Sequence, residues 1–245
     1  MTQQAFFITG TDTGVGKTLV AASLLHAAGA TGAATLGLKP VAAGGSVYAG
    51  EFQNEDARLL QMTASIALDY AQVNPVALQA AIAPHIAARQ EGVSLSVAAL
   101  ADHCREVLQH RGADFAVVEG AGGWLVPLAG QDTMADLAAA IGLPVILVIR
   151  LQLGCLNHAL LTAGAITSAG LPLAGWIGSA APDAMAAANE NLATLRERLP
   201  APCLGVLPYL GADPNPAQAA AYLDLKPLKL KTSELKTLVL KTQGP

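Results

Sequence analysis

A glycine-containing stretch near the start of the chain combines an apolar run with side chains that could handle phosphate. Residues 6–25 read FFITGTDTGVGKTLVAASLL, so the apolar run and a loop lead to Gly16, Lys17 and Thr18 at the start of a helical pattern. Backbone N–H groups in such a loop bind phosphate oxygens, and the helix dipole favours their negative charge. Lys17 can reach the β- and γ-phosphates, and the Thr18 hydroxyl can bind Mg²⁺. The sequence therefore predicts a nucleoside-triphosphate site.

The spacing of this loop departs by one residue from the common phosphate-loop pattern. Thr11 stands where the pattern has its first glycine, and Gly10 lies one position further out. A chance glycine-rich turn is the alternative, but the strand before the loop and the helix after it favour the phosphate site. A dinucleotide fingerprint would need a third glycine where Leu19 stands, and an acid where the second strand offers Lys39. We therefore reject a dinucleotide site.

Lys39 is one of only two lysines among residues 1–225, and it lies near the end of the apolar run 36–42. Because the carboxyl ends of parallel strands meet at one edge of a sheet, its ammonium is expected beside the phosphate loop. A lysine at a strand end can also simply extend its charge into solvent. The scarcity of lysine favours a second cation that, with Lys17, stabilises transferred phosphate or an anionic intermediate.

Three acidic side chains are candidates for the same edge. Glu119 ends the apolar run 115–119 and is followed by glycines that let a ligand approach the backbone, which is typical of a Mg²⁺ partner. A helix or turn acid is the alternative. Asp56 begins a helical pattern, where the helix dipole alone would favour an acid. Asp12 lies in the loop and could bind a basic substrate group or orient the loop, so its role stays open.

The composition of the 245 residues limits the classes of function. Hydrophobic residues make up 53%, charged residues 13% and aromatic residues 4%. This apolar content excludes disorder across the whole chain. The few stacking aromatics and the net charge of −4 argue against a nucleic-acid partner. Three cysteines, Cys104, Cys155 and Cys203, form no zinc-binding pattern.

The charge is unevenly distributed along the chain. Residues 1–225 contain nine Lys and Arg against 17 Asp and Glu, a net charge of −8, whereas residues 226–245 contain five lysines against one acid, a net charge of +4. We therefore expect a single α/β domain over 1–225 and a basic C-terminal extension, or a cloning remnant, over 226–245. No apolar run approaches the ~20 residues of a membrane span, and the N-terminus lacks a basic secretory segment. We expect a cytoplasmic protein with no membrane partner.

Short apolar runs alternate with helical patterns. The expected strands are residues 5–9, 36–42, 115–119, 144–150, 173–178 and 203–208. The expected helices are residues 17–28, 56–63, 94–110, 133–141, 155–169 and 184–199. Strands that are apolar throughout are typically covered on both faces. The pattern predicts an α/β fold with a doubly wound, mostly parallel sheet, helices on both faces and a P-loop NTPase-like architecture. Residues 71–93 fit this rhythm less well, and we expect them to form a substrate-binding excursion.

Several blocks in a fixed order resemble the dethiobiotin synthetase family. They are GTDTGVGKT (10–18), LKPVAAG (38–44), NEDA (54–57), NP…APHIAARQEG (74–92), VVEGAGGW (117–124), LPVILVI (143–149), LGCLNHALLT (153–162), LAGW (173–176) and PAPCLGVLPYL (200–210). Many blocks in order are far more specific than a lone phosphate loop. The resemblance runs from about residue 5 to residue 225, and only the tail lies outside it.

The resemblance implies an ATP- and Mg²⁺-dependent ring closure, a late step of biotin biosynthesis. The substrates would be 7,8-diaminopelargonate and CO₂ or bicarbonate. CO₂ adds to one amine as a carbamate, ATP phosphorylates the carbamate, and the second amine displaces phosphate to form the cyclic urea of dethiobiotin. The resemblance also implies a homodimer whose partner chain helps to bind the carboxylate of the substrate.

The resemblance further implies roles for individual residues of this chain. The catalytic residues would be Lys17 and Lys39. The Mg²⁺ ligands would be Thr18, Asp56 and Glu119. The substrate contacts would be Asp12, Ala43 and Asn157. The nucleotide would lie against Gly14, Val15, Gly16, Lys17, Thr18, Leu19, Asp56, Glu119, Gly120, Ala121, Gly122, Ser179, Ala180, Pro208, Tyr209 and Leu210.

Two positions depart from the family pattern. Ala43 stands where the family commonly has serine, so a hydroxyl contact to the carbamate is lost or replaced. Ser179 and Ala180 stand where the family commonly has Asn-Asp, so a side-chain amide that reads adenine would be missing. We therefore expect triphosphate binding with a relaxed choice of base.

Two other classes of protein use comparable phosphate loops. A switch or partitioning ATPase of the related group would carry an extra lysine early in the loop, and residues 10–16 contain none. A small-molecule kinase is not expected to carry the Lys39 strand or the EGAGGW block of residues 119–124. An ATP-dependent cyclo-ligase is therefore the leading interpretation, and the switch ATPase is the alternative.

Overall fold

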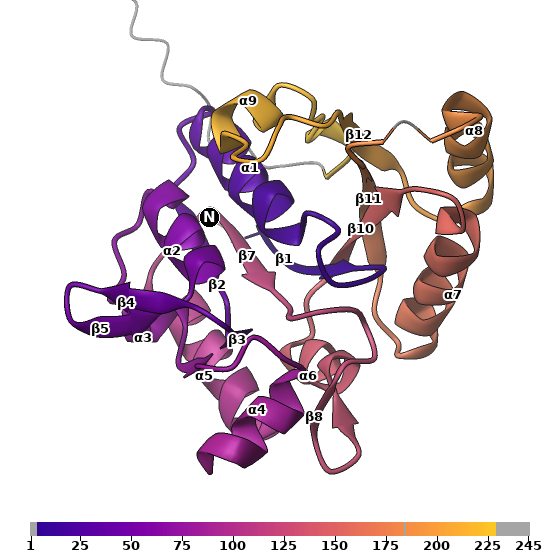
Figure 1. The fold of residues 1–245 in the computed structure, drawn as a ribbon. Coiled ribbons are helices and arrows are strands. Elements are labelled where there is room, and N and C mark those ends of the chain that lie inside the picture. The colour runs from indigo at the N-terminus through magenta and orange to yellow at the C-terminus, as the bar shows by residue number, and fades with distance from the viewer. Residues whose placement is uncertain (1–3, 184, 229–245) are drawn as a thin grey trace, which may run out of the picture.

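The structure is a computed structural model that describes residues 4–183 and 185–228, and a six-stranded sheet forms its centre (Figure 1). The strands lie in the order β12-β11-β10-β1-β7-β2, and every neighbouring pair is parallel. Their bounds are β1 Gln4–Gly10, β2 Thr35–Leu38, β7 Phe115–Glu119, β10 Val145–Leu151, β11 Leu173–Ala180 and β12 Cys203–Leu207. Because β1 lies inside the sheet, the loop that follows it opens at the middle of the carboxyl edge.

Helices and short strands connect these six strands. The helices are α1 Lys17–Gly29, α2 Glu55–Thr63, α3 Tyr70–Val73, α4 Pro84–Glu91, α5 Val97–His110, α6 Met134–Ile141, α7 Cys155–Ser168, α8 Ala188–Arg198 and α9 Pro216–Ala220, with a 3₁₀ turn η1 at Lys226–Leu228. The short strands are β3 Val41–Ala43, β4 Ser46–Tyr48, β5 Glu51–Gln53, β6 Val76–Leu78, β8 Pro127–Ala129 and β9 Asp132–Thr133.

Two buried clusters lie on opposite faces of the sheet. Successive side chains of a strand point to opposite faces, and the clusters follow that alternation. Ile8 and Val148 pack with α1 and α9 on one face, whereas Phe7 and Leu147 pack with α5, α6 and α7 on the other. The doubly wound, mostly parallel fold predicted from the sequence is confirmed.

The apolar run 36–42 forms two strands, so the prediction of one continuous strand is wrong. β2 ends at Leu38, and β3 pairs in parallel with β6 outside the main sheet. Pro40 accounts for the break, because proline has no backbone N–H to donate to a ladder. The backbone N–H of Lys39 donates instead to a carbonyl at the end of α3, at 2.8 Å. Lys39 therefore lies where the chain leaves the sheet.

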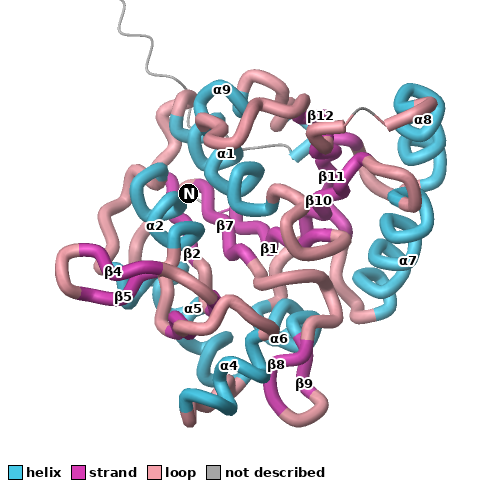
Figure 2. The backbone as a smooth tube through the Cα atoms, in the orientation of Figure 1, coloured by secondary structure: helices cyan, strands magenta, loops and turns pink. Residues whose placement is uncertain are grey.

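Small elements that were not predicted surround the carboxyl edge. The antiparallel hairpins β4–β5 and β8–β9 project from the body of the molecule (Figure 2). The segment 71–93, which does depart from the strand–helix rhythm, contains β6 and α4. Pro84 lies in the first turn of α4, where a missing N–H breaks no helical hydrogen bond.

The last described residues pack against the domain. Leu228 is buried, and the side-chain amide of Gln4 donates to its carbonyl at 3.3 Å. Residues 229–245, which are most of the basic tail, lie outside the described residues, so the domain boundary at residue 225 stays a prediction. Within the described part of the chain, no helix has the length and apolar character to cross a membrane.

Candidate functional site

The phosphate loop lies between β1 and α1, at the carboxyl edge of the sheet. Gly16 precedes α1 with a φ of 94°, a left-handed conformation that glycine adopts without strain. Gly10 meets a different requirement, because a Cβ built there would lie 2.5 Å from Cγ2 of Val15. Glycine is therefore needed at position 10, although the common phosphate-loop pattern would place it one residue later, at position 11. The loop delivers Lys17 and Thr18 to the first turn of α1.

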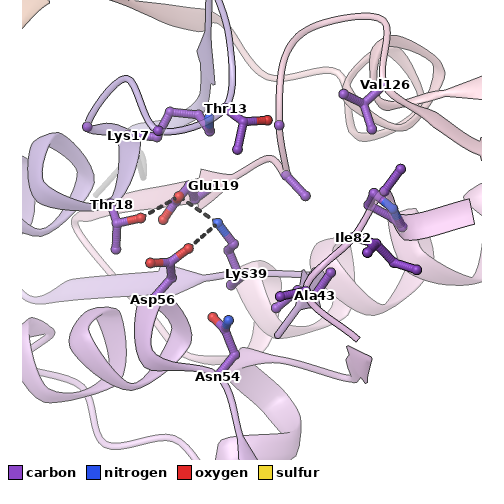
Figure 3. A pocket seen from close by; sticks show the side chains of 18 residues that line it. Thr13, Lys17, Thr18, Lys39, Ala43, Asn54, Asp56, Ile82, Glu119 and Val126 are labelled. Carbon is purple, nitrogen blue, oxygen red and sulfur yellow. Dashed lines mark hydrogen bonds and ion pairs between the residues drawn. The ribbon is translucent and has the colours of Figure 1, made fainter. Parts of the chain in front are cut away.

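A cavity of about 710 Å³ opens beside this loop (Figure 3). Its walls come from the loop, the starts of α1, α2 and α4, and the chain that follows β2 and β7. The predicted site residues that line it are Gly14, Gly16, Lys17, Thr18, Lys39, Ala43, Asp56, Glu119, Ala121 and Gly122. The other lining residues are Thr13, Ala42, Asn54, Ala81, Ile82, Ala83, Pro84 and Val126.

Lys39 lies between two carboxylates in this cavity. Its Nζ is 2.6 Å from Oε1 of Glu119 and 3.1 Å from Oδ2 of Asp56. The Thr18 hydroxyl donates to the same Glu119 oxygen at 2.9 Å (Figure 3). Lys39 and Glu119 are buried, whereas the side chain of Asp56 is 45% exposed. The structure thus brings together four residues that lie far apart in the sequence.

Burial and charge act in opposite directions on this cluster. Burial alone would lower the pKa of Lys39, but the carboxylates of Glu119 and Asp56 outweigh it and raise that pKa above its usual value. Burial raises the pKa of Glu119, and the nearby ammonium of Lys39 opposes the rise. Burial would likewise raise the pKa of Asp56, yet Lys39 holds it below its usual range. The short contact and the second carboxylate favour a charged Lys39 that faces a charged Glu119.

Lys17 is the second cation of the cavity. Its Nζ donates to the Asp12 carbonyl of the loop at 2.9 Å, and the residue is buried. Burial, followed by repulsion from Lys39, lowers the pKa of Lys17 to about 8. A bound polyphosphate would supply the missing counter-charge and reverse this shift. Among the described residues, Lys17 is therefore a cation that contacts no carboxylate of its own, in a site shaped for an anion.

The oxygen atoms around Lys39 fit the preferences of Mg²⁺. Oε2 of Glu119 is buried and has no hydrogen-bond partner among the described residues. Together with the Asp56 carboxylate and the Thr18 hydroxyl, it offers the hard oxygen ligands that Mg²⁺ prefers. No group of three His, Cys, Asp or Glu side chains that could hold a metal occurs in the described part of the chain. The remaining ligand positions would therefore fall to water and to phosphate oxygens.

Two asparagines that position the site lie in the blocks of family resemblance but were not identified from the sequence as site residues. Asn54 caps α2 by accepting from the Ala57 N–H at 3.1 Å, and its Nδ2 donates to the Gly44 carbonyl at 2.9 Å. An asparagine just before two acids and an apolar pattern is a helix-start signal that could have found it. Asn74 donates to the Lys39 carbonyl at 2.6 Å, across 35 residues of chain. No local pattern indicates that second contact.

Known proteins resemble this chain over most of its length. A family model described as an AAA domain matches residues 4–216. The ATP-dependent dethiobiotin synthetase of Pseudomonas paraeruginosa is 57% identical over 224 residues, which cover 91% of this chain and 97% of that protein. This chain belongs to the ATP-dependent dethiobiotin synthetase family. A second synthetase of this name, from Cellvibrio japonicus, is 55% identical over 228 residues, with 93% of this chain and 99% of that protein covered.

One solved structure with some likeness is a signal recognition particle receptor FtsY from Elizabethkingia anophelis in complex with GDP. It is 15% identical, has a TM-score of 0.49, and the match covers 89% of this chain and 59% of that chain. This likeness is too distant to bear on the function of a dethiobiotin synthetase.

The residues that the synthetase resemblance assigns to the nucleotide base lie at the same edge but do not line the cavity. Ser179 is buried near the end of β11, and its Oγ lies 2.9 Å from the position that a Cβ on Gly16 would occupy. Ala180 ends β11, and residues 208–210 follow β12. Tyr209 among them is half exposed. Residues 179–180 and 208–210 could therefore contact only the part of a ligand that extends beyond the phosphate loop.

The remaining residues assigned by the synthetase resemblance differ in their surroundings. The Asp12 carboxylate accepts from the Thr13 N–H at 2.7 Å, so it orients the loop in this structure. Asn157 is exposed on α7 and lies outside the cavity of its own chain. The cavity is not lined by Val15, Leu19 or Gly120. Any contact of these three residues with a nucleotide would therefore be made by backbone groups.

Proposed function

We propose that this chain closes the ureido ring of dethiobiotin from 7,8-diaminopelargonate and CO₂, with ATP and Mg²⁺. CO₂ adds to one of two neighbouring amines, which loses a proton, and a carbamate forms. The γ-phosphoryl group of ATP passes to a carbamate oxygen and leaves ADP. The second amine attacks the carbamoyl carbon, loses a proton and displaces phosphate as the C–O bond breaks. The observation that carries the proposal is the meeting of Lys39, Glu119 and Thr18 beside the phosphate loop, in a chain of the synthetase family.

Two ammonium groups would serve the anionic atoms of this reaction. Lys17, in the loop, would bind the β- and γ-phosphates. Lys39, across the cavity, would face the carbamate and the phosphoryl group that it receives. Phosphoryl transfer depends on positioning and on neutralisation of charge rather than on covalent chemistry. Because both lysines are buried, their charges act with little screening by water.

Thr18, Asp56 and Glu119 would hold Mg²⁺ between the protein and the triphosphate. The ion would supply positive charge that neutralises the phosphate oxygens. The hydroxyl, the two carboxylates and the unpartnered Oε2 of Glu119 support this assignment. The side chain of Asp56 is 45% exposed, so a phosphate oxygen or a water could approach an ion that it holds.

The wall that faces away from the phosphate loop suits an aliphatic diamine. Ala43, Ile82 and Val126 lie there (Figure 3), and an apolar surface favours the methylene chain of the substrate. Ala43 offers no hydroxyl to a carbamate, so Lys39 would be the polar group nearest to it. Asp12 and Glu119 are the acids that we propose for the amines.

A homodimer would bring Asn157 to a substrate. Asn157 is exposed on α7, outside the cavity of its own chain. Leu153, just before α7, is 95% exposed, and Leu161 on the same helix is 65% exposed. Large apolar side chains exposed on a helix and just before it are typical of an interaction surface. We propose that two copies pair through α7, so that each Asn157 serves the cavity of its partner.

The test is to incubate the purified protein with ATP, MgCl₂, ¹³C-bicarbonate and 7,8-diaminopelargonate. The expected result is dethiobiotin with ¹³C in the ureido carbonyl, with one ADP and one phosphate released per ring. Absence of ring product with all four components present would contradict the proposal. ADP release that the diamine does not change would instead support the switch-type ATPase.

A further inference from the structure

Arg150 contacts the phosphate loop from outside the cavity. It lies near the end of β10, the strand that pairs with β1 on the side opposite to β7. Its Nη1 donates to the Gly14 carbonyl at 2.8 Å, across 136 residues of chain. Gly14 lines the cavity, whereas Arg150 does not. This guanidinium has no role in the function proposed above.

Two cations thus hold two carbonyls of one loop. Lys17 holds the Asp12 carbonyl from within the cavity, at 2.9 Å. Under the proposed function a triphosphate would draw the Lys17 ammonium to its own oxygens and release that carbonyl. The contact between Arg150 and Gly14 does not compete with the ligand, because Arg150 lies outside the cavity. This charge-assisted hydrogen bond to the loop would therefore persist after a nucleotide binds.

The geometry of the peptide bond links this hydrogen bond to the orientation of a backbone N–H group. The peptide that joins Gly14 to Val15 is planar, and its N–H points opposite to its C=O. A carbonyl that is held outward by Arg150 therefore directs the Val15 N–H inward. Backbone N–H groups of such loops are the groups that bind phosphate oxygens. The arginine fixes the direction of a donor that it does not touch.

The neighbouring strand supports the same part of the loop. Arg150 and Ser179 are register partners on the parallel strands β10 and β11, so their side chains emerge on one face of the sheet. Ser179 lies against Gly16, as Arg150 lies against Gly14. Both glycines have left-handed backbone conformations, with φ of 71° and 94°. Glycine is conformationally permissive, so contacts from outside are needed to keep the loop in one shape.

We propose that Arg150 is a positioning residue for the nucleotide, because its bond to the Gly14 carbonyl aims the Val15 N–H at the polyphosphate. The proposal rests on the phosphate-binding part of the proposed function and not on the ring closure. A charge-assisted hydrogen bond is stronger than a neutral one, so its loss should weaken polyphosphate binding about tenfold.

Isothermal calorimetry with inorganic tripolyphosphate and with ATP, each with Mg²⁺, tests the proposal on the intact protein. Arg150→Met should raise the Kd of both ligands about tenfold, and Arg150→Lys should recover most of the affinity, because it keeps a cationic donor. In turnover, KM for ATP should rise while kcat stays within about twofold. Arg111→Met, which removes an exposed arginine at the end of α5, is the matched control and should change neither Kd.

Unchanged tripolyphosphate affinity in Arg150→Met, or an equal loss in Arg111→Met, would overturn the proposal. Arg150→Gln, which is closer in polarity, gives a second reading if the methionine variant does not fold. The wild-type ring-closure assay separates the two ideas. If the wild type makes no dethiobiotin but Arg150→Met binds tripolyphosphate more weakly, the positioning role stands and the ring-closure proposal fails. If the wild type makes dethiobiotin and Arg150→Met binds tripolyphosphate normally, only the positioning role fails.

Discussion

The Nζ of Lys39 lies 2.6 Å from Oε1 of Glu119, and both side chains are buried. A buried carboxylate requires a counter-charge, and in this structure the lysine supplies it. Asp56 adds a second carboxylate to the same ammonium, at 3.1 Å. The two carboxylates that would bind Mg²⁺ under the proposed function are therefore already paired with a cation, each through one oxygen. Under that proposal, the lysine and the metal would compete for the same carboxylates.

The first prediction concerns this competition. Lys39→Met should raise the affinity for Mn²⁺ in the absence of nucleotide by about tenfold or more, because it removes a positive charge from the oxygens that the ion needs. Mn²⁺ stands in for Mg²⁺ because its paramagnetic resonance signal reports the free ion directly, with no turnover required. The wild-type protein should bind Mn²⁺ well only once a nucleotide adds its phosphate oxygens.

Lys39→Arg is the matched control for this measurement. It retains a positive charge beside Glu119 and should bind Mn²⁺ as weakly as the wild type. Equal Mn²⁺ affinity in wild type and Lys39→Met would show that the ammonium does not occupy the metal ligands.

The second prediction concerns the two cations in turnover. Lys17→Ala and Lys39→Ala should each lower kcat by at least ~10²-fold, as expected when charge stabilisation of a transition state is lost. Lys226→Ala removes an exposed lysine from η1, away from the cavity, and should leave kcat unchanged. Circular dichroism of each variant confirms that the fold is intact. Near-normal turnover in Lys39→Ala would remove its catalytic role.

The layers of the fold could be predicted because the sequence signals are strong and local. The run 144–150 is apolar on both faces up to Ile149 and is bounded by loops, which is what a buried parallel strand requires. The run 36–42 looks equally apolar, yet Pro40 breaks the ladder and moves its second half to another sheet. The hairpin β4–β5 consists of two three-residue strands, which are too short to give a clear alternation.

The candidate site could be predicted where function depends on local spacing. The loop with Lys17 and Thr18 is a local pattern, and the ends of parallel strands bring Lys39 and Glu119 to one edge. Contacts that depend on tertiary packing had no such signal. The approach of Asn74 to the Lys39 carbonyl and of Arg150 to the loop joins segments that are 35 and 136 residues apart.

The third prediction concerns the choice of nucleotide. Ser179 offers a short hydroxyl where the family commonly has an amide, so kcat/KM for CTP and GTP should lie within about tenfold of the value for ATP. The Ser179→Asn variant should raise the preference for ATP, because an amide can both donate to and accept from adenine. The conservative variant Ser179→Thr keeps a hydroxyl and serves as the control. Strict use of ATP by the wild type would contradict the prediction.

The fourth prediction concerns the three cysteines. Burial raises the pKa of the Cys104 thiol to about 12, so at pH 8 only about one thiol in 10⁴ is the reactive thiolate. Cys155 is 2% exposed, whereas Cys203 is partly exposed. Reaction of the native protein with an aromatic disulfide reagent should therefore show one fast thiol per chain, and Cys203→Ser should abolish that phase.

Cys104→Ser should leave the fast phase unchanged and remove one of the slow thiols. The slow phase should accelerate with urea, because Cys104 lies on the buried face of α5, in the core cluster, and reacts only when that helix opens. Two fast thiols in the native protein would show that α5 or α7, the helices that carry Cys104 and Cys155, is packed more loosely than the structure indicates. Full reaction of all three thiols in guanidinium chloride provides the calibration.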